Sequence, residues 1–284
     1  MSAPYTFTLH DTPDFTELII ERGVNTEARA RGFAPPDELA AFVRDNDGIV
    51  RGGVNGEVEW GWLYIDLLWL DDRMHGNGHG LNLMRAIEGA AAQRGCKHSW
   101  LATTSFQALP FYYAYGYRLL GVLEDRPPGY NYYFLRHEDI GIYETSIRVT
   151  DDPDPADLVT LRQGLAAHSR SKGATPDAKR LSIYLEDDEG AIYGGLIGAT
   201  YWGWLDIQTV WIKPQLRGQG YGAQMLALAE AESVRRGCPF AFADVADFQA
   251  LGFFERQGYT TFATLPERPP GHHTHFMRKS LRDV

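Results

Sequence analysis

The second half of this 284-residue chain repeats the first half. Residues 60–63 (WGWL) return as residues 202–205, and residues 126–129 (RPPG) return as residues 268–271, in both cases 142 positions later. The match from 60–136 to 202–278 needs no insertion or deletion. Solenoid repeats are only about 20 to 50 residues long, whereas a unit of this length can bury its own core. The sequence therefore predicts two domains of one fold, residues 1–141 and 142–284.

Composition limits the classes of partner. The chain carries 27 basic and 37 acidic residues, a formal net charge of -10. Nucleic-acid binding usually needs a basic face, so we expect no nucleic-acid partner. No stretch approaches the roughly 20 apolar residues of a membrane span, and we expect no membrane partner. The N-terminus lacks a basic region followed by an apolar run, and two cysteines are too few for a disulfide scaffold, which together predict a cytoplasmic protein.

The order of predicted elements is the same in both halves. A helical region comes first, followed by short strands, a strongly apolar strand, a glycine-rich turn, a helix, a strand, a second helix and two closing strands. In the first half the helix after the turn is marked by an apolar stripe at Met84, Ile87 and Ala91. The other elements fall at residues 14–43, 48–55, 63–70, 75–80, 98–103, 107–115, 117–123 and 132–136. In the second half the first of them fall at 155–169, 191–199 and 205–212. This order predicts an α+β fold in each half, with a mixed sheet flanked by helices.

The glycine-rich turn is the segment that indicates chemistry. It reads RGQGYG at residues 217–222 and HGNGHG at residues 75–80. Alternating glycines let the backbone turn sharply and approach a ligand, and the N-terminus of the following helix offers unpaired N–H groups to an anion. The turn matches neither a P-loop nor a dinucleotide fingerprint. One such turn is a weak signal, but its recurrence between the same two elements is specific.

Together with the aromatic segment at 111–117 (FYYAYGY) and the PPG before each last strand, these turns resemble the GCN5-related N-acetyltransferases (GNAT). The resemblance covers both halves. It implies two tandem GNAT-like domains, acetyl-CoA as co-substrate, and direct transfer of the acetyl group to an amine. The loop amides would hold the pyrophosphate and the preceding strand would pair with the pantetheine arm. The implied binding residues are Leu68, Leu70, His75, Gly76, Asn77, Gly78, His79 and Gly80 in the first half, and Val210, Ile212, Arg217, Gly218, Gln219, Gly220, Tyr221 and Gly222 in the second.

Acetyl transfer to an amine needs two further groups. One must take a proton from the amine, and one must supply a donor to the departing CoA thiolate. The resemblance implies Tyr112 as the donor and Asp66 as the base. Structural interpretations stay open beside these roles. Tyr112 stands in an aromatic helix face, and Asp66 could point to solvent or cap a neighbour.

The two halves differ at both of these positions. Phe254 stands where Tyr112 would recur, and Gln208 stands where Asp66 would recur. We therefore expect the N-terminal domain to be catalytic and the C-terminal domain to bind CoA or to shape the substrate site. Two alternatives remain. The chain could be a non-catalytic acyl-CoA-binding or ligand-sensing module, or the C-terminal domain could be active through Asp206 or a histidine.

The remaining polar candidates have structural interpretations. We expect Cys96 and Cys238 to be small buried residues and not nucleophiles. The histidines near the C-terminus are expected to be solvated loop and strand residues, so no metal is predicted. Arg126 and Arg268 are expected to anchor turns. The histidines in question are His272, His273 and His275.

The expected partner is a small-molecule amine acceptor. The acidic composition suits a cationic acceptor, although no motif names one. The expected state is a monomer in which the two domains pair as a dimer of single-domain relatives would.

Overall fold

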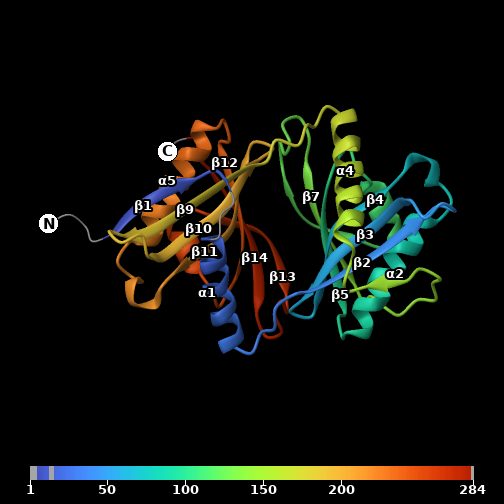
Figure 1. The fold of residues 1–284 in the computed structure, drawn as a ribbon, viewed down its shortest axis with the longest axis horizontal. Helices are drawn as coiled ribbons and strands as arrows, with labels where there is room; N and C mark the ends of the chain where they lie inside the picture. Colours follow the sequence, from blue (N-terminus) through green and yellow to red (C-terminus); the bar gives the residue numbers. More distant parts are fainter. Residues whose placement is uncertain (1–4, 13–15, 283–284) are drawn as a thin grey trace.

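The computed structural model describes residues 5–12 and 16–282 and forms two seven-stranded mixed sheets flanked by helices (Figure 1). The predicted α+β architecture is therefore confirmed. The first half contains β1 (Tyr5–His10), α1 (Glu17–Ala30), β2 (Asp37–Arg44), β3 (Val50–Glu59), β4 (Trp62–Leu70), η1 (Asp72–Met74), α2 (His79–Gln93), β5 (His98–Thr104), α3 (Leu109–Tyr115), β6 (Arg118–Leu123) and β7 (Tyr132–Glu138). The second half contains β8 (Val149–Thr150), α4 (Pro155–Ser171), β9 (Lys179–Asp187), β10 (Ile192–Tyr201), β11 (Trp204–Ile212), η2 (Pro214–Leu216), α5 (Tyr221–Arg235), β12 (Phe240–Ala246), α6 (Leu251–Arg256), β13 (Thr260–Pro266) and β14 (His273–Ser280).

The two halves exchange their first strand and first helix. Strand β1 pairs antiparallel with β9, and β8 pairs antiparallel with β2. Helix α1 packs on β10 and β11, whereas α4 packs on β3 and β4 (Figure 1). We call the sheet β6-β7-β5-β4-β3-β2-β8 with α2, α3 and α4 the N-unit, and the other sheet with α1, α5 and α6 the C-unit. The division into 1–141 and 142–284 thus describes the sequence repeat, while each unit takes its first strand and helix from the other half.

A glycine-to-tryptophan contact seats each exchanged helix. A Cβ added at Gly23 of α1 would lie 2.2 Å from a ring atom of Trp211 on β11. The same holds for Gly164 of α4 and Trp69 on β4, again at 2.2 Å. The two contacts therefore repeat each other, and in both the absence of a side chain lets the helix lie directly on the indole.

This packing predicts that Gly164→Ala destabilises the protein. The added methyl group must push the Trp69 indole or the helix away, and such overpacking costs typically about 1–3 kcal/mol. Urea unfolding should show a free energy of unfolding lower by that amount. Gly141→Ala is the matched control, since nothing lies within 4 Å of its added Cβ. Equal midpoints for the two variants would contradict the tight helix contact.

Residues 37–44 form a strand, so the predicted helical region at 14–43 is correct only in its first part. The three consecutive residues Leu39, Ala40 and Ala41 are all buried. Leu39 and Ala41 pack in the core beneath α2, while Phe42 packs in the cluster beneath α4. A strand covered on both faces loses the apolar–polar alternation that identifies a strand in a sequence.

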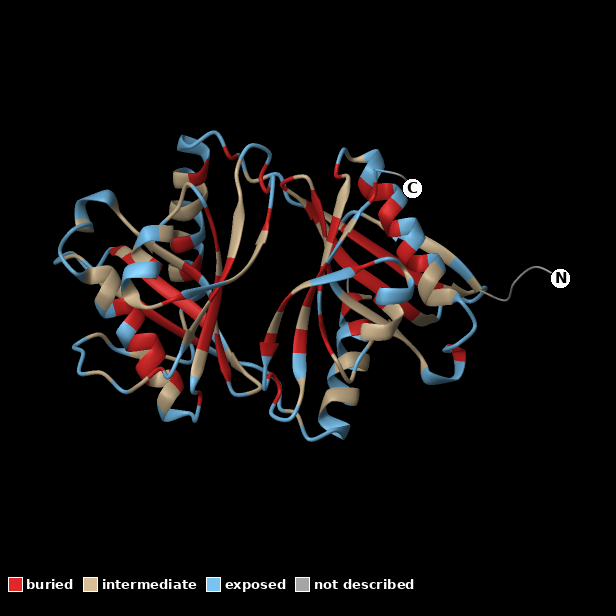
Figure 2. Cartoon of the chain, turned by 180° about the vertical axis from the view of Figure 1, so that it is seen from behind, coloured by how far each residue is buried: buried red, intermediate tan, exposed pale blue. Residues whose placement is uncertain are grey.

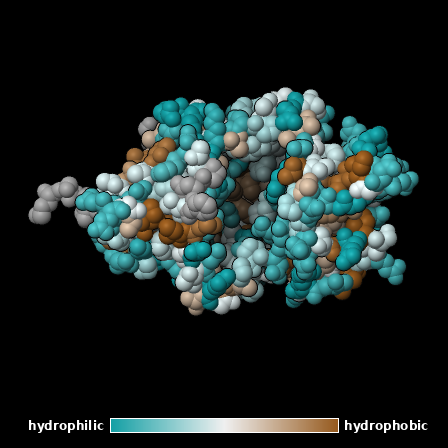
Figure 3. Space-filling model, viewed as in Figure 1, coloured by the Kyte–Doolittle hydropathy of each residue, from teal (hydrophilic) through white to brown (hydrophobic). Residues whose placement is uncertain are grey.

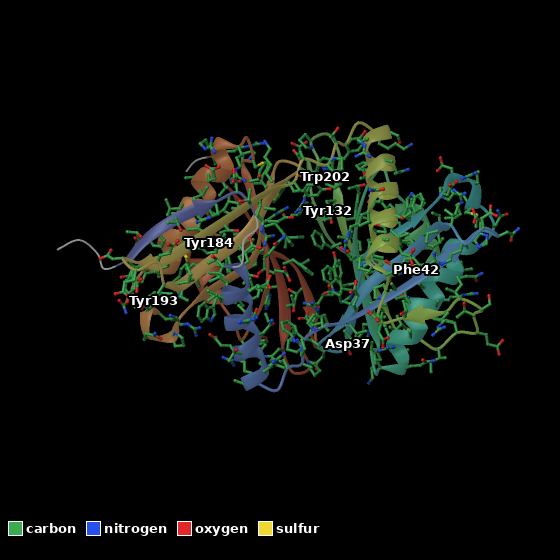
Figure 4. All side chains as sticks on the ribbon, viewed as in Figure 1. Asp37, Phe42, Tyr132, Tyr184, Tyr193 and Trp202 are labelled. Carbon is green, nitrogen blue, oxygen red and sulfur yellow. The ribbon has the colours of Figure 1, made fainter. Side chains whose placement is uncertain are left out.

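The two sheets face each other across a shared aromatic cluster. Each unit also has its own core between its sheet and helices, and buried residues run along the strands of both sheets (Figure 2). Tyr132 and Trp202 lie at the junction of the two units with ring centroids 6.4 Å apart (Figure 4). Cys96 and Cys238 are both buried, as predicted. The shared cluster consists of Trp62, Trp100, Leu123, Phe134, Trp204, Ala263, Leu265 and Phe276.

Candidate functional site

In each unit, two neighbouring parallel strands separate part-way along their length. Strands β4 and β5 pair only from Trp62↔His98 to Ile65↔Leu101. Strands β11 and β12 pair over the equivalent four positions, ending at Ile207↔Ala243. Beyond these positions, among the described strands, β4 pairs only with β3 and β11 pairs only with β10. We call this place the separation point, because backbone groups beyond it are available to a ligand.

Asp66 lies at the separation point of the N-unit. Ile65 pairs with Gly56 and Leu67 with Asn55, so Asp66 is an extra residue in the strand, a β-bulge. Bulges re-aim side chains and are frequent beside active sites. The Asp66 side chain is exposed, and the Asn55 amide donates a long hydrogen bond of 3.5 Å to its Oδ2. Gln208 is the bulge residue of the C-unit, where its Oε1 accepts a 3.2 Å hydrogen bond from Arg180.

The surroundings of Asp66 are acidic. Burial raises the pKa of Glu57, and the nearby carboxylates of Asp66 and Glu38 raise it further, while Arg268 opposes them. Carboxylates held close together repel one another and attract cations. The exposed side of the N-unit at its separation point therefore favours a positively charged group such as an ammonium.

The glycine-rich loops have the conformation of an anion site. Gly78 adopts φ 78° and forms the N-cap of α2, and Gly220 adopts φ 87° and forms the N-cap of α5. Gly76 and Gly218 also have positive φ, at 78° and 74°. These angles favour glycine. Each loop leads directly into the N-terminus of a 15-residue helix, where unpaired N–H groups attract anions.

A cavity of about 630 Å³ connects the loop of the C-unit with its separation point. A volume of this size is typical of a small-molecule site. Val210, Ile212, Arg217, Gly218, Gly220 and Gly222 line it, as the sequence predicted for a CoA site, together with Gln208 and Phe254. The surface is also hollowed between the two units on the face shown in Figure 3.

The model of the acetyltransferase (GNAT) family matches residues 6–117 and again 149–259. The chain belongs to this family. It is 36% identical over 130 residues to blasticidin-S acetyltransferase of Streptomyces morookaense, covering 44% of this chain and 96% of that protein. It is 33% identical over 117 residues to acetyltransferase Atu2258 of Agrobacterium fabrum, covering 41% of this chain and 85% of that protein.

A solved acetyltransferase from Bacillus cereus ATCC 14579 is 32% identical, with a TM-score of 0.42, and covers 45% of this chain and 95% of that structure. Each relative thus corresponds to about one half of the chain. The match of the family model to both halves makes the protein an acetyl-CoA-dependent N-acetyltransferase with a duplicated GNAT domain.

Tyr112 of this acetyltransferase is enclosed in the N-unit core. It lies on α3 with 7% of its surface exposed, and burial raises the pKa of its phenol well above the ordinary value. The phenol therefore keeps its proton over the physiological range. Its counterpart Phe254 on α6 lines the cavity of the C-unit. By this equivalence, Tyr112 borders the corresponding region of the N-unit.

Two loop residues predicted for binding turn their side chains elsewhere. Gln219 donates its side-chain amide to the carbonyl of Gln215, and the Tyr221 ring packs against Tyr5 of the exchanged strand β1. Neither is among the cavity-lining residues, so these two positions could contribute only their backbone amides. In the N-unit, Leu68 and Leu70 likewise pack against the core and leave only their backbone for a ligand.

The sequence missed the contribution of the exchanged helix. Val24, Glu27 and Ala28 of α1 line the cavity of the C-unit, as does Arg31 directly after the helix. Glu27 forms an ion pair with Arg217 of the glycine-rich loop. No pattern within either half signals this contact, because it depends on the exchange. The cavity therefore has walls from both halves of the sequence.

The predicted turn-anchoring role of Arg126 and Arg268 is incomplete. Arg126 donates to Asp206 of the opposite half at 2.7 Å, and Arg268 donates to Glu59 of the opposite half at 2.8 Å. Both arginines are buried, and Arg126 lies 5.8 Å above the Trp204 ring. They join the two units, and Asp206, considered above as an alternative base, is held in one of these ion pairs.

No helix within residues 5–12 and 16–282 is long and apolar enough to span a membrane. The same residues include no group of three or more histidine, cysteine, aspartate or glutamate side chains placed to hold a metal ion. His272 instead contacts the Asp247 carboxylate at 2.7 Å.

Proposed function

We propose that the N-unit transfers the acetyl group of acetyl-CoA to the amine of a small molecule, with Asp66 as proton acceptor and Tyr112 as proton donor. The observation that carries this proposal is the position of Asp66. It is the bulge residue at the separation point of β4 and β5, and its carboxylate is exposed beside an open backbone edge.

Each residue has one task in this reaction. Acetyl-CoA, when bound, supplies an activated acetyl carbon. Asp66 holds the incoming ammonium and takes its proton, directly or through a water molecule, which frees the nitrogen lone pair. Tyr112 retains its proton because it is buried, and it can donate that proton to the departing thiolate. The amides at the N-terminus of α2, with His75 and Asn77 of the loop, would hold the phosphates.

The C-unit is proposed to bind acetyl-CoA in its own cavity. Support comes from the loop glycines, Arg217 and the strand residues Val210 and Ile212, which all line that cavity. The proposal includes a monomer acting in the cytoplasm, with the two units in place of a dimer. The printed name of the Streptomyces relative supports a small-molecule acceptor, and the acidic surroundings of Asp66 support a cationic one.

The test is thiol release from acetyl-CoA by the full chain with a panel of amines, combined with mass spectrometry of the product. The panel holds polyamines, aminoglycosides, blasticidin S, amino acids and neutral arylamines. Acetylation of at least one small amine supports the proposal. Thermal stabilisation by acetyl-CoA without acetylation of any amine would instead support a ligand-sensing module.

Tyr112→Phe should lower kcat by about 100-fold, the order of magnitude that a positioned proton donor contributes. The fold should tolerate this change, because Phe254 occupies the matching position of the C-unit. Steady-state thiol release measures the effect, and circular dichroism checks the fold. Tyr113→Phe is the control, since Tyr113 is its exposed neighbour on α3. Equal losses in the two variants would argue against a specific role for Tyr112.

A further inference from the structure

The C-unit has a carboxylate at its own separation point, on the strand opposite to the one that carries Asp66. The β11–β12 ladder ends at Ile207↔Ala243, so the next residues along the two strands are Gln208 and Asp244. In the N-unit the corresponding pair is Asp66 and Ala102. Each unit therefore keeps one carboxylate at this point, on β4 in the N-unit and on β12 in the C-unit.

Asp244 is placed to meet a ligand. It lines the cavity of the C-unit together with Gln208 and the loop glycines, and its side chain is exposed to that space. Neighbouring residues on β12, Ala243 and Val245, point into the core, so alternation along the strand directs Asp244 to the open side. No other residue in the described part of the chain forms an ion pair with its carboxylate within 4.0 Å.

The groups around Asp244 shape its charge state. Desolvation among the cavity walls raises its pKa, and Arg268 opposes that effect. Arg268 itself forms an ion pair with Glu59, to which it donates at 2.8 Å. Gln208 is also hydrogen-bonded elsewhere, because its side-chain oxygen accepts from Arg180. Asp244 is thus the carboxylate at this separation point that remains available to an amine.

We propose that Asp244 is the proton-accepting residue of a second acetyl-transfer site in the C-unit. This inference rests on the proposed function of the chain as a small-amine acetyltransferase. The ammonium of the acceptor gives one proton to Asp244. Its nitrogen then forms a bond to the acetyl carbon while the carbon–sulfur bond of acetyl-CoA breaks. As the amide forms, the nitrogen loses its second proton. The CoA thiolate leaves with the bonding pair and receives that proton through a water molecule, because Phe254 has none to give.

The missing donor sets the expected rate of this second site. A positioned proton donor contributes at least about 100-fold, so the C-unit should run at about one hundredth of the rate of the N-unit. The acceptor of this second site is a small cationic amine, because the carboxylate of Asp244 lies where the acceptor nitrogen would bind.

The experiment measures thiol release in a chain whose N-unit is disabled by Asp66→Asn and Tyr112→Phe together, so that the N-unit contributes far less than the C-unit. The remaining rate should fall at least tenfold further when Asp244→Asn is added. It should return in part when Gln208→Asp is added to that triple variant, which moves the carboxylate back to the strand that carries it in the N-unit. Calorimetric binding of acetyl-CoA should stay within twofold throughout, which separates chemistry from folding.

Two results would overturn the inference. In one, Asp244→Asn leaves the rate of the chain carrying Asp66→Asn and Tyr112→Phe unchanged. In the other, that chain binds acetyl-CoA but releases no thiol above the uncatalysed rate. A failure of the proposed function looks different. Asp66→Asn would then keep the full wild-type rate, and loss of that rate on adding Asp244→Asn would place all activity in the C-unit and still support the role of Asp244.

Discussion

Asp66→Asn should lower kcat by about 100-fold and leave the KM for acetyl-CoA within about twofold of the wild-type value, since general bases typically contribute 100-fold or more. The reason is geometric. Asp66 is the bulge residue where β4 and β5 separate, and in the proposed reaction it meets the amine and not the CoA arm. An amide of nearly the same shape keeps the bulge but cannot accept the proton. Steady-state thiol release with a saturating acceptor measures the effect.

The matched control for this change is Asp188→Asn. Asp188 is exposed in the turn between β9 and β10, so its substitution removes the same charge away from the separation point. We expect wild-type kcat and KM for it. If Asp66→Asn raised the KM for the amine without lowering kcat, the carboxylate would bind the acceptor and not act as a base.

Lys279→Met should lower the free energy of unfolding by about 3 kcal/mol, because removing one partner of a buried ion pair strands the other charge. Glu230 on α5 has only 4% of its side chain exposed and pairs with Lys279 of β14 at 2.7 Å. The Tyr259 hydroxyl also donates to this carboxylate at 3.0 Å, and burial, together with the charge of Glu230, raises the pKa of Tyr259. A hydroxyl does not neutralise a buried carboxylate, so the lysine charge is needed. Urea unfolding followed by tryptophan fluorescence measures the loss.

Two further variants separate charge from packing at this pair. Lys279→Arg keeps the cation and should stay within about 1 kcal/mol of the wild type, as expected for a retained pair. Adding Glu230→Gln to Lys279→Met removes the stranded charge and should restore most of the loss. If the single and double variants unfolded at the same urea concentration, the stability would come from packing of the lysine chain and not from its charge.

Most elements could be predicted from the sequence because the repeat gives two independent views of each one. The exchange of β1 and α1 could not. Either sheet edge offers the same antiparallel partner to β1, since β2 and β9 are equivalent strands of a duplicated fold. The choice depends on how the segments after Ala30 and Ser171 run in space, and no residue pattern encodes that path. The Gly23 and Gly164 contacts with tryptophan are visible only once the helices are in place.

The candidate site divides in the same way. The glycine-rich loops and Asp66 follow from local sequence, because a turn into a helix and an apolar strand are recognisable motifs. Asp244 depends on the register of β11 and β12, which places it beyond the end of a four-pair ladder. Its position 142 residues after Ala102 gives no hint, since the two residue types differ. The proposed role of Asp244 therefore follows from the pairing of β11 with β12 and could not be predicted from the sequence repeat.

Single-turnover acetyl transfer, with enzyme in excess over acetyl-CoA and an amine identified from the panel, tests the central claim most directly because it separates chemistry from product release. Wild-type protein should show a fast phase of product formation. Asp66→Asn should bind acetyl-CoA with unchanged affinity and lose that phase, leaving a phase slower by about 100-fold. A fast phase of equal rate and amplitude in Asp66→Asn would contradict the assignment of Asp66 as the base of the N-unit.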